Sequence, residues 1–216
     1  MTGLRSAQPD AGRAAPAEHQ SPAGPAGALL TAVSMTAGRG RAARTVTALA
    51  RLTPQDRVLD VGCGPGTAAR IAGRQCAGVT GVDPAPEMLR LGQWITRWRG
   101  PADVTFRSGR AEMLPLPPAS VTVAWAISTV HHWADRAAGL AEMARVLAPG
   151  GRVLLAERLA RPGARGLAAH GLTRDQASQV AAELAAAGFT GVSWGIHQAG
   201  RRTLVVLTGR VPAAPD

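Results

Sequence analysis

The order of short apolar runs and helical segments most constrains the fold of this chain. Apolar runs lie at 57–61, 79–82, 104–107, 121–127 and 152–156, and segments with helical spacing of apolar residues lie at 67–75, 86–99 and 136–147. A strand that is apolar along its whole length is buried on both faces, which is typical of a parallel sheet covered by helices. The sequence therefore predicts an α/β fold with a doubly wound, mostly parallel sheet.

The end of the chain extends this sheet. A predicted helix at 174–187 is followed by apolar runs at 190–197 and 202–207. These two runs are close enough in sequence to pair as an antiparallel C-terminal hairpin. With them, the prediction becomes a seven-stranded sheet within a core at 53–210.

The segments outside this core have a different character. Helical spacing at 28–35 and 41–52 is interrupted by Gly38 and Gly40, which predicts two hinged helices, and we expect these to cover the functional site. Residues 1–27 are mostly Ala, Pro and Gly, and such a segment buries too little apolar surface to offset the entropy of ordering. We expect disordered tails at 1–27 and 211–216.

Composition excludes several classes of protein. Cys63 and Cys76 are too few for a disulfide framework or an iron–sulfur cluster, and their spacing does not suit a zinc cluster. No run approaches the ~18 apolar residues of a membrane span, and the N-terminus lacks the apolar segment of a secretion signal. We therefore expect a cytoplasmic protein without a membrane span.

The net charge of +10 raises the question of nucleic-acid binding. All 24 basic residues counted as Lys or Arg are Arg, and they are scattered from Arg5 to Arg210 with no run longer than Arg201–Arg202. This spread favours a solvated basic surface over a nucleic-acid interface, so we consider nucleic acid a disfavoured partner.

A glycine-rich segment follows the first predicted strand. Gly62, Gly64 and Gly66 are spaced two residues apart and precede a predicted helix, so backbone N–H groups and a helix N-terminus converge there. Asp60 lies at the strand end, where a carboxylate opposes a pyrophosphate and suits an ammonium group. Asp83 ends the second strand 23 residues later, the position from which an acid accepts hydrogen bonds from ribose hydroxyls. The pattern favours a nucleoside with a zwitterionic tail.

Several ordered motifs resemble those of class I S-adenosylmethionine-dependent methyltransferases, in particular the small-molecule enzymes similar to those of ubiquinone and menaquinone biosynthesis. The matching segments are VLDVGCGPGT at 58–67, GVDPAPEML at 81–89, GRAEMLPL at 109–116, VHHW at 130–133 and EMARVLAPGG at 142–151. The resemblance implies a Rossmann-like fold, S-adenosylmethionine as cofactor with S-adenosylhomocysteine as product, and no metal.

The resemblance also implies a set of cofactor-binding positions. The methionine moiety would lie against Asp60 and the glycine loop, the ribose against Asp83, and the adenine between Met88 or Pro84 and the rim formed by Ala111 and Glu112. The full set is Asp60, Gly62, Cys63, Gly64, Gly66, Asp83, Pro84, Met88, Ala111, Glu112 and Ala126. We interpret Cys63 as a small filler of the loop rather than a nucleophile.

Two positions depart from the family pattern. The family's Asp in "G-D-A-E" is Arg110 here, so its contact to the adenine amino group is lost or passes to Glu112. The usual "F-D" that opens the fourth strand is Val121-Thr122, which puts a supporting hydrogen bond in doubt.

Catalytic residues are less constrained. Methyl transfer requires alignment of nucleophile and methyl carbon, and a base only when the acceptor is a weakly ionised hydroxyl or carbon acid. His131 and His132 follow the fourth strand and are the candidate bases, with His170 a weaker candidate, although a packing role for the His-His-Trp segment is the favoured interpretation. Trp94 and Trp98 share one helix face and are predicted to pack.

The sequence leaves alternatives open. The leading hypothesis is O- or C-methylation of a small molecule by a monomer or homodimer. An RNA methyltransferase is the alternative within the same chemistry. A non-catalytic S-adenosylmethionine-binding subunit and an NAD-dependent oxidoreductase are alternatives from other classes.

Overall fold

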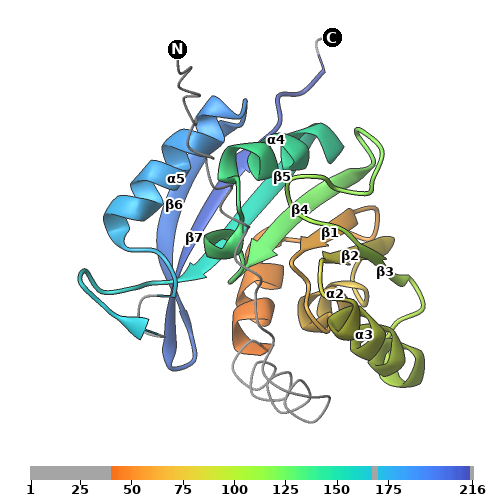
Figure 1. The fold of residues 1–216 in the computed structure, drawn as a ribbon. Helices are drawn as coiled ribbons and strands as arrows, with labels where there is room; N and C mark the ends of the chain where they lie inside the picture. Colours follow the sequence, from red (N-terminus) through yellow and green to blue (C-terminus); the bar gives the residue numbers. More distant parts are fainter. Residues whose placement is uncertain (1–39, 167–169, 215–216) are drawn as a thin grey trace, which may run out of the picture.

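The computed structural model describes residues 40–166 and 170–214, and it contains a single sheet with helices on both sides (Figure 1). The strands are β1 Arg57–Val61, β2 Gly78–Asp83, β3 Val104–Ser108, β4 Val121–Ile127, β5 Leu147–Arg158, β6 Thr190–Ala199 and β7 Arg202–Arg210. They follow the order β3-β2-β1-β4-β5-β7-β6. β1 to β5 are parallel, whereas β7 pairs antiparallel with both β5 and β6. The predicted seven-stranded sheet with an antiparallel finish is confirmed.

The helices form two layers over this sheet. They are α2 Thr67–Ala72, α3 Pro86–Arg99, α4 Arg136–Val146 and α5 Arg174–Ala186, with a short 3-10 helix, η1, at Val130–His132. Apolar residues of α4 and α5 pack on one face of the sheet, where Leu140 and Leu184 are fully buried. The opposite face is covered by α2 and by residues 40–50 (Figure 1). Apolar strands with both faces covered explain the continuous apolar runs in the sequence.

The helix at 40–50 is part of the layer over the sheet. Ala42, Ala43, Val46 and Ala50 are buried in the same cluster as Trp125 of β4. The remainder of the predicted pair of covering helices and the tail at 1–27 lie outside the described residues. At the other end, the Val211 N–H donates to the Gly151 carbonyl oxygen, so Val211 continues the pairing of β7 beyond Arg210.

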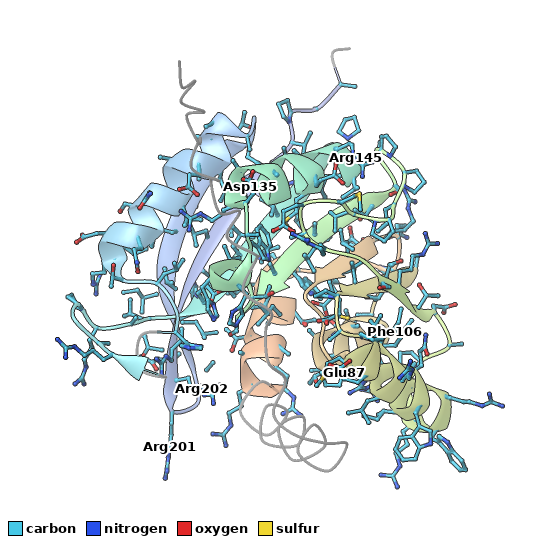
Figure 2. All side chains as sticks on the ribbon, in the orientation of Figure 1. Glu87, Phe106, Asp135, Arg145, Arg201 and Arg202 are labelled. Carbon is cyan, nitrogen blue, oxygen red and sulfur yellow. The ribbon has the colours of Figure 1, made fainter. Side chains whose placement is uncertain are left out.

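The prediction that Trp94 and Trp98 pack into the core is wrong. Their exposed fractions are 61% and 72%, and their ring centroids lie 6.4 Å apart on the outer face of α3. α3 covers the edge strand β3 and its neighbour β2. It buries only Leu89 and Gly92, and the missing side chain of Gly92 leaves room for the Phe106 ring (Figure 2). A helix at the edge of a sheet has a narrow buried stripe, and both tryptophans fall outside it.

In the described parts of the chain, no helix combines the length and the apolar character that crossing a bilayer requires.

Candidate functional site

The loop after β1 is shaped by glycines that no other residue could replace without strain. Gly62, Gly64 and Gly66 have φ angles of 66°, 52° and 73°, in the left-handed region. A Cβ on Gly62 would overlap with the Thr129 side chain beyond β4, and one on Gly66 would lie 2.5 Å from the Phe106 ring. The loop therefore packs closely between the segment that follows β4 and the β3 residue Phe106, and its backbone lines the site.

Asp83 joins the ends of β1 and β2. Its Oδ2 accepts a hydrogen bond from the Gly64 N–H at 2.8 Å, and its Oδ1 accepts one from the Ala85 N–H at 2.9 Å. The side chain lies in a buried position, as does that of Asp60, which comes from the adjacent strand β1. Through its two oxygens, Asp83 holds the glycine loop and the segment that follows β2.

Cys63 fills the interior of this loop. Burial, and after it the negative charges of Asp60 and Asp83, raises the pKa of the Cys63 thiol well above its usual value. The Sγ lies 3.4 Å from the Gly64 carbonyl oxygen and would be 2.8 Å from a Cβ on Gly81. A protonated, enclosed thiol is a poor nucleophile, which agrees with the interpretation of Cys63 as a filler.

Two of the predicted adenine-side residues follow β3. Ala111 is buried. Glu112 faces the loop before α4, where its Oε1 accepts hydrogen bonds from the Ala134 N–H at 2.8 Å and the Asp135 N–H at 3.3 Å. Burial would raise the pKa of Glu112, but hydrogen bonds from its own backbone N–H and from those of Asp135 and Ala134 outweigh it and lower the pKa. The carboxylate of Glu112 thus stabilises the segment from which α4 begins.

Two further adenine-side candidates lie beyond the end of β2. Pro84 is exposed and Met88, in the first turn of α3, is half-buried. Both positions follow the strand that ends at Asp83, so they lie on the same side of the loop as the predicted ribose contact.

The end of β4 carries the candidate catalytic residues. Ala126 is fully buried and pairs with Val61, so it adjoins the start of the glycine loop. η1 then presents His131 and His132. Glu157 of β5 is fully buried, and it accepts a hydrogen bond from the Val130 N–H at 2.8 Å through Oε1. Its Oε2 lies 3.0 Å from His131 Nδ1.

This geometry sets the orientation of the His131 ring. A carboxylate at Nδ1 holds the proton there and leaves the Nε2 lone pair as the acceptor. Nε2 is buried and has no hydrogen-bond partner among the described residues. A buried nitrogen with an unused lone pair is uncommon and is the feature of this site that packing alone does not explain.

His170 lies beside the other two histidines. The ring centroids of His131 and His170 are 5.3 Å apart, those of His132 and His170 are 5.8 Å apart, and those of His131 and His132 are 3.9 Å apart. The link after β5 therefore brings a residue 38 positions away into contact with η1. The structure thus collects His131, His132 and His170 into one group beyond the carboxyl ends of β4 and β5.

Arg110 and Thr122, the two departures from the family pattern, lie in different parts of the structure. Arg110 is mostly exposed, with Nε 3.5 Å from Glu112 Oε2. Thr122 lies at the amino end of β4, whereas the glycine loop lies at the carboxyl end of β1. The Thr122 hydroxyl donates to Asp56 Oδ1 at 2.6 Å and accepts from the Arg57 N–H at 3.0 Å. Thr122 therefore keeps a hydrogen bond between β1 and β4 at a distance from the glycine loop.

Trp133, which precedes α4, and Arg145 of α4 make packing and hydrogen-bond contacts with neighbouring segments. The Trp133 ring covers Gly139, where an added Cβ would lie 2.6 Å from a ring carbon. Arg145 of α4 pairs with Glu142 and donates to the carbonyl oxygens of Leu114 and Leu116, which anchors the loop after β3 (Figure 2).

Sequence reasoning missed Glu157. An acid at the end of an otherwise apolar strand was the available signal, because a buried carboxylate requires partners. The fixed orientation of His131 depends on it.

Comparison with known proteins agrees with the fold and the motifs. Residues 59–155 match the family described as "Methyltransferase domain". A 27-O-demethylrifamycin SV methyltransferase of Amycolatopsis mediterranei is 37% identical over 107 residues, which cover 48% of this chain and 39% of that protein. The uncharacterized methyltransferase YcgJ of Bacillus subtilis (strain 168) is 34% identical over 106 residues, which cover 49% of this chain and 42% of that protein. The chain spans about two fifths of the length of these curated relatives.

Solved structures share the architecture. The crystal structure of YcgJ superposes with a TM-score of 0.67 at 18% identity, covering 80% of this chain and 98% of that one. A Haloferax volcanii protein solved in complex with the Trm112 methyltransferase activator gives a TM-score of 0.74 at 19% identity, covering 86% and 95%. At such identities the likeness shows the fold.

In its motifs, in its fold and over residues 59–155, the chain resembles class I S-adenosylmethionine-dependent methyltransferases. The match to the methyltransferase domain extends over residues 59–155, from the middle of β1 to β5.

Proposed function

We propose that the protein transfers a methyl group from S-adenosylmethionine to a small-molecule acceptor, at oxygen or carbon. The observation that carries this proposal is the pair of buried acids, Asp60 and Asp83, on either side of a glycine loop at the carboxyl edge of a parallel sheet. Buried carboxylates repel a pyrophosphate, which argues against a dinucleotide, and they attract the ammonium and hydroxyl groups of a nucleoside amino acid.

The residues of the loop fit this cofactor. Positive φ angles, and the overlap that a Cβ would cause at Gly62, require glycine in this loop. Because glycine has no side chain, a ligand can approach the loop backbone closely. Asp83 would accept hydrogen bonds from the ribose hydroxyls, and Asp60 would face the methionine ammonium group. Pro84, Met88, Ala111 and Ala126 would line the rest of the cofactor site, with Glu112 at its rim.

When bound, S-adenosylmethionine supplies a methyl group activated by a sulfonium. The protein then contributes alignment, exclusion of water and, for a hydroxyl or carbon acid, removal of a proton. His131 is the proposed proton acceptor, because Glu157 holds its Nδ1 and leaves the Nε2 lone pair. His132, which is exposed beside it, is the second proposed base.

The class of acceptor is supported by relatives rather than by this chain's own residues. The Amycolatopsis relative is a 27-O-demethylrifamycin SV methyltransferase, and another relative, from Synechocystis, is a 2-methyl-6-phytyl-1,4-hydroquinone methyltransferase. Both names describe action on small organic molecules with oxygen substituents, which is the acceptor class proposed here.

Ligand binding tests the cofactor assignment. S-adenosylhomocysteine at about 100 times its dissociation constant should stabilise the protein by roughly 2.7 kcal/mol. For a domain of this size, that raises the melting temperature by about 5–10 °C. NAD serves as the matched control, and a shift with NAD but not with S-adenosylhomocysteine would overturn the proposal.

A second candidate function, methylation of RNA, is favoured by one observation. Trp94 and Trp98 are exposed on α3 and lie beside the exposed Arg97 and Arg99. Exposed aromatic rings next to guanidinium groups can stack on unpaired bases. Transfer of label from S-adenosylmethionine to bulk RNA, compared with transfer to a metabolite extract, distinguishes the two functions. Label found only on RNA would reverse their order.

A further inference from the structure

We propose that His131, His132 and His170 form a binding site for a divalent transition metal ion, with Zn²⁺ as the probe. One ring nitrogen from each histidine lies within 4.8 Å of those from the other two. Three neutral imidazoles are a ligand set that suits zinc and the neighbouring transition metals and does not suit magnesium or calcium.

The distances are compatible with coordination after a small adjustment. Zinc–nitrogen bonds of about 2.0–2.1 Å in a tetrahedral arrangement place the ligand nitrogens roughly 3.4 Å apart. His132 and His170 are exposed, so their rings can turn toward each other without moving packed side chains. His131 is the rigid member, because Glu157 holds its ring.

The orientation of His131 is the independent observation that points to a metal. Its Nδ1 faces the fully buried Glu157 carboxylate at 3.0 Å, and its buried Nε2 has no partner among the described residues. A carboxylate hydrogen-bonded to one ring nitrogen, with the lone pair of the other nitrogen unused, is the arrangement that orients a metal-binding histidine. The second Glu157 oxygen accepts from the Val130 N–H, so the carboxylate is itself fixed.

The site also has a functional consequence, which rests on the function proposed above. Three protein ligands leave the fourth tetrahedral position open. A hydroxyl of the acceptor that binds there loses its proton to water more readily, because the metal stabilises the oxygen anion. The metal would then take over the role otherwise given to His131 as a base, and the acceptor would be an alcohol, phenol or enol rather than a carbon acid.

Metal binding is measured first, without any methyl acceptor. Untagged full-length protein is treated with a chelator, dialysed, and titrated with Zn²⁺ by calorimetry and with Co²⁺ by visible absorption. We expect one metal ion per chain and the spectrum of nitrogen-coordinated Co²⁺. His170→Ala should weaken binding on the order of 10–100-fold, and Glu157→Gln should do the same through His131.

Matched controls separate this site from unspecific binding. His197→Ala removes an imidazole on β6, outside the group, and should leave Zn²⁺ affinity unchanged. Because His170 is exposed, its variant should melt at the wild-type temperature in the absence of metal. No Zn²⁺ binding, wild-type affinity in His170→Ala, or a cobalt–thiolate absorption band from Cys63 or Cys76 would each refute the metal site.

The same samples distinguish failure of the metal site from failure of the proposed function. Binding of S-adenosylhomocysteine without any Zn²⁺ binding would refute only the metal site. Zn²⁺ binding that depends on His170, in a protein that binds NAD and not S-adenosylhomocysteine, would refute only the proposed function. With both proposals correct, His170→Ala keeps S-adenosylhomocysteine affinity and loses transfer to hydroxyl acceptors.

Discussion

Replacing Asp83 by asparagine should be far from conservative, although the two side chains have nearly the same shape. In the structure, one carboxylate oxygen accepts from the Gly64 N–H at 2.8 Å and the other from the Ala85 N–H at 2.9 Å. Asparagine keeps one acceptor oxygen and replaces the other by an amide NH₂. One backbone N–H would therefore face another donor in a buried position.

The size of the effect follows from these two contacts. A hydrogen bond to a charged group contributes about 1.5–3 kcal/mol, and asparagine loses one of the two. For a chain of this length, that corresponds to a fall in melting temperature of about 3–12 °C. Loss of the charged acceptor for a ribose hydroxyl would weaken S-adenosylhomocysteine binding by roughly 10- to 150-fold.

Thermal melting and calorimetric titration with S-adenosylhomocysteine measure the two effects separately. Asp103→Asn, which alters an exposed acid just before β3, is the matched control and should change neither quantity. A 2′- or 3′-deoxyribose analogue of S-adenosylhomocysteine completes a double-mutant cycle. The analogue should bind the wild-type protein more weakly than S-adenosylhomocysteine does, and this difference in affinity should disappear in Asp83→Asn.

Two results would refute the reasoning. An unchanged melting temperature would mean that the hydrogen bonds to Gly64 and Ala85 do not hold the loop. Wild-type affinity for S-adenosylhomocysteine in Asp83→Asn would mean that Asp83 does not accept the ribose hydroxyls.

Two further predictions concern stability. Burial would raise the pKa of Asp56, but hydrogen bonds from Arg152, Thr122 and the Thr53 backbone outweigh it and hold the pKa well below its usual value, about 3.9. The unfolded state therefore binds the proton first, so Asp56 stabilises the fold above about pH 4 and this contribution is lost as the pH falls further. Asp56→Asn should flatten the decline in denaturation midpoint below about pH 4, whereas a slope equal to wild type would contradict the assignment. Gly62→Ala should cost about 2–5 kcal/mol in chemical denaturation, from left-handed backbone strain and overlap with Thr129. Gly191→Ala has a similar φ of 60° and open space around it, so it should cost only the strain, about 1–2 kcal/mol, and equal losses in the two variants would argue against the overlap.

Local patterns in the sequence were sufficient for the framework of the site. Continuous apolar runs predicted the buried parallel strands, and glycines after the first run predicted the loop. Asp60 and Asp83 could be placed at one edge of the sheet because the carboxyl ends of neighbouring parallel strands meet there. These features depend on residues that are close in sequence or on the regular geometry of the sheet.

The partners of individual side chains could not be predicted in the same way. Trp94 and Trp98 have the spacing of a packed helix face, and only the position of α3 at the sheet edge leaves them exposed. Glu112 was expected at the adenine rim, and its contacts with the start of α4 depend on how two loops meet.

The sequence by itself determined the succession of strands and helices along the chain, the glycine loop with its acids, and the family that the motifs resemble. Only the tertiary structure brought His170 to His131 and His132 and placed Glu157 behind the His131 ring. The physical reason is that contacts between residues dozens of positions apart depend on strand register and on the course of the connecting loops. Neither is encoded in the local periodicity of apolar residues.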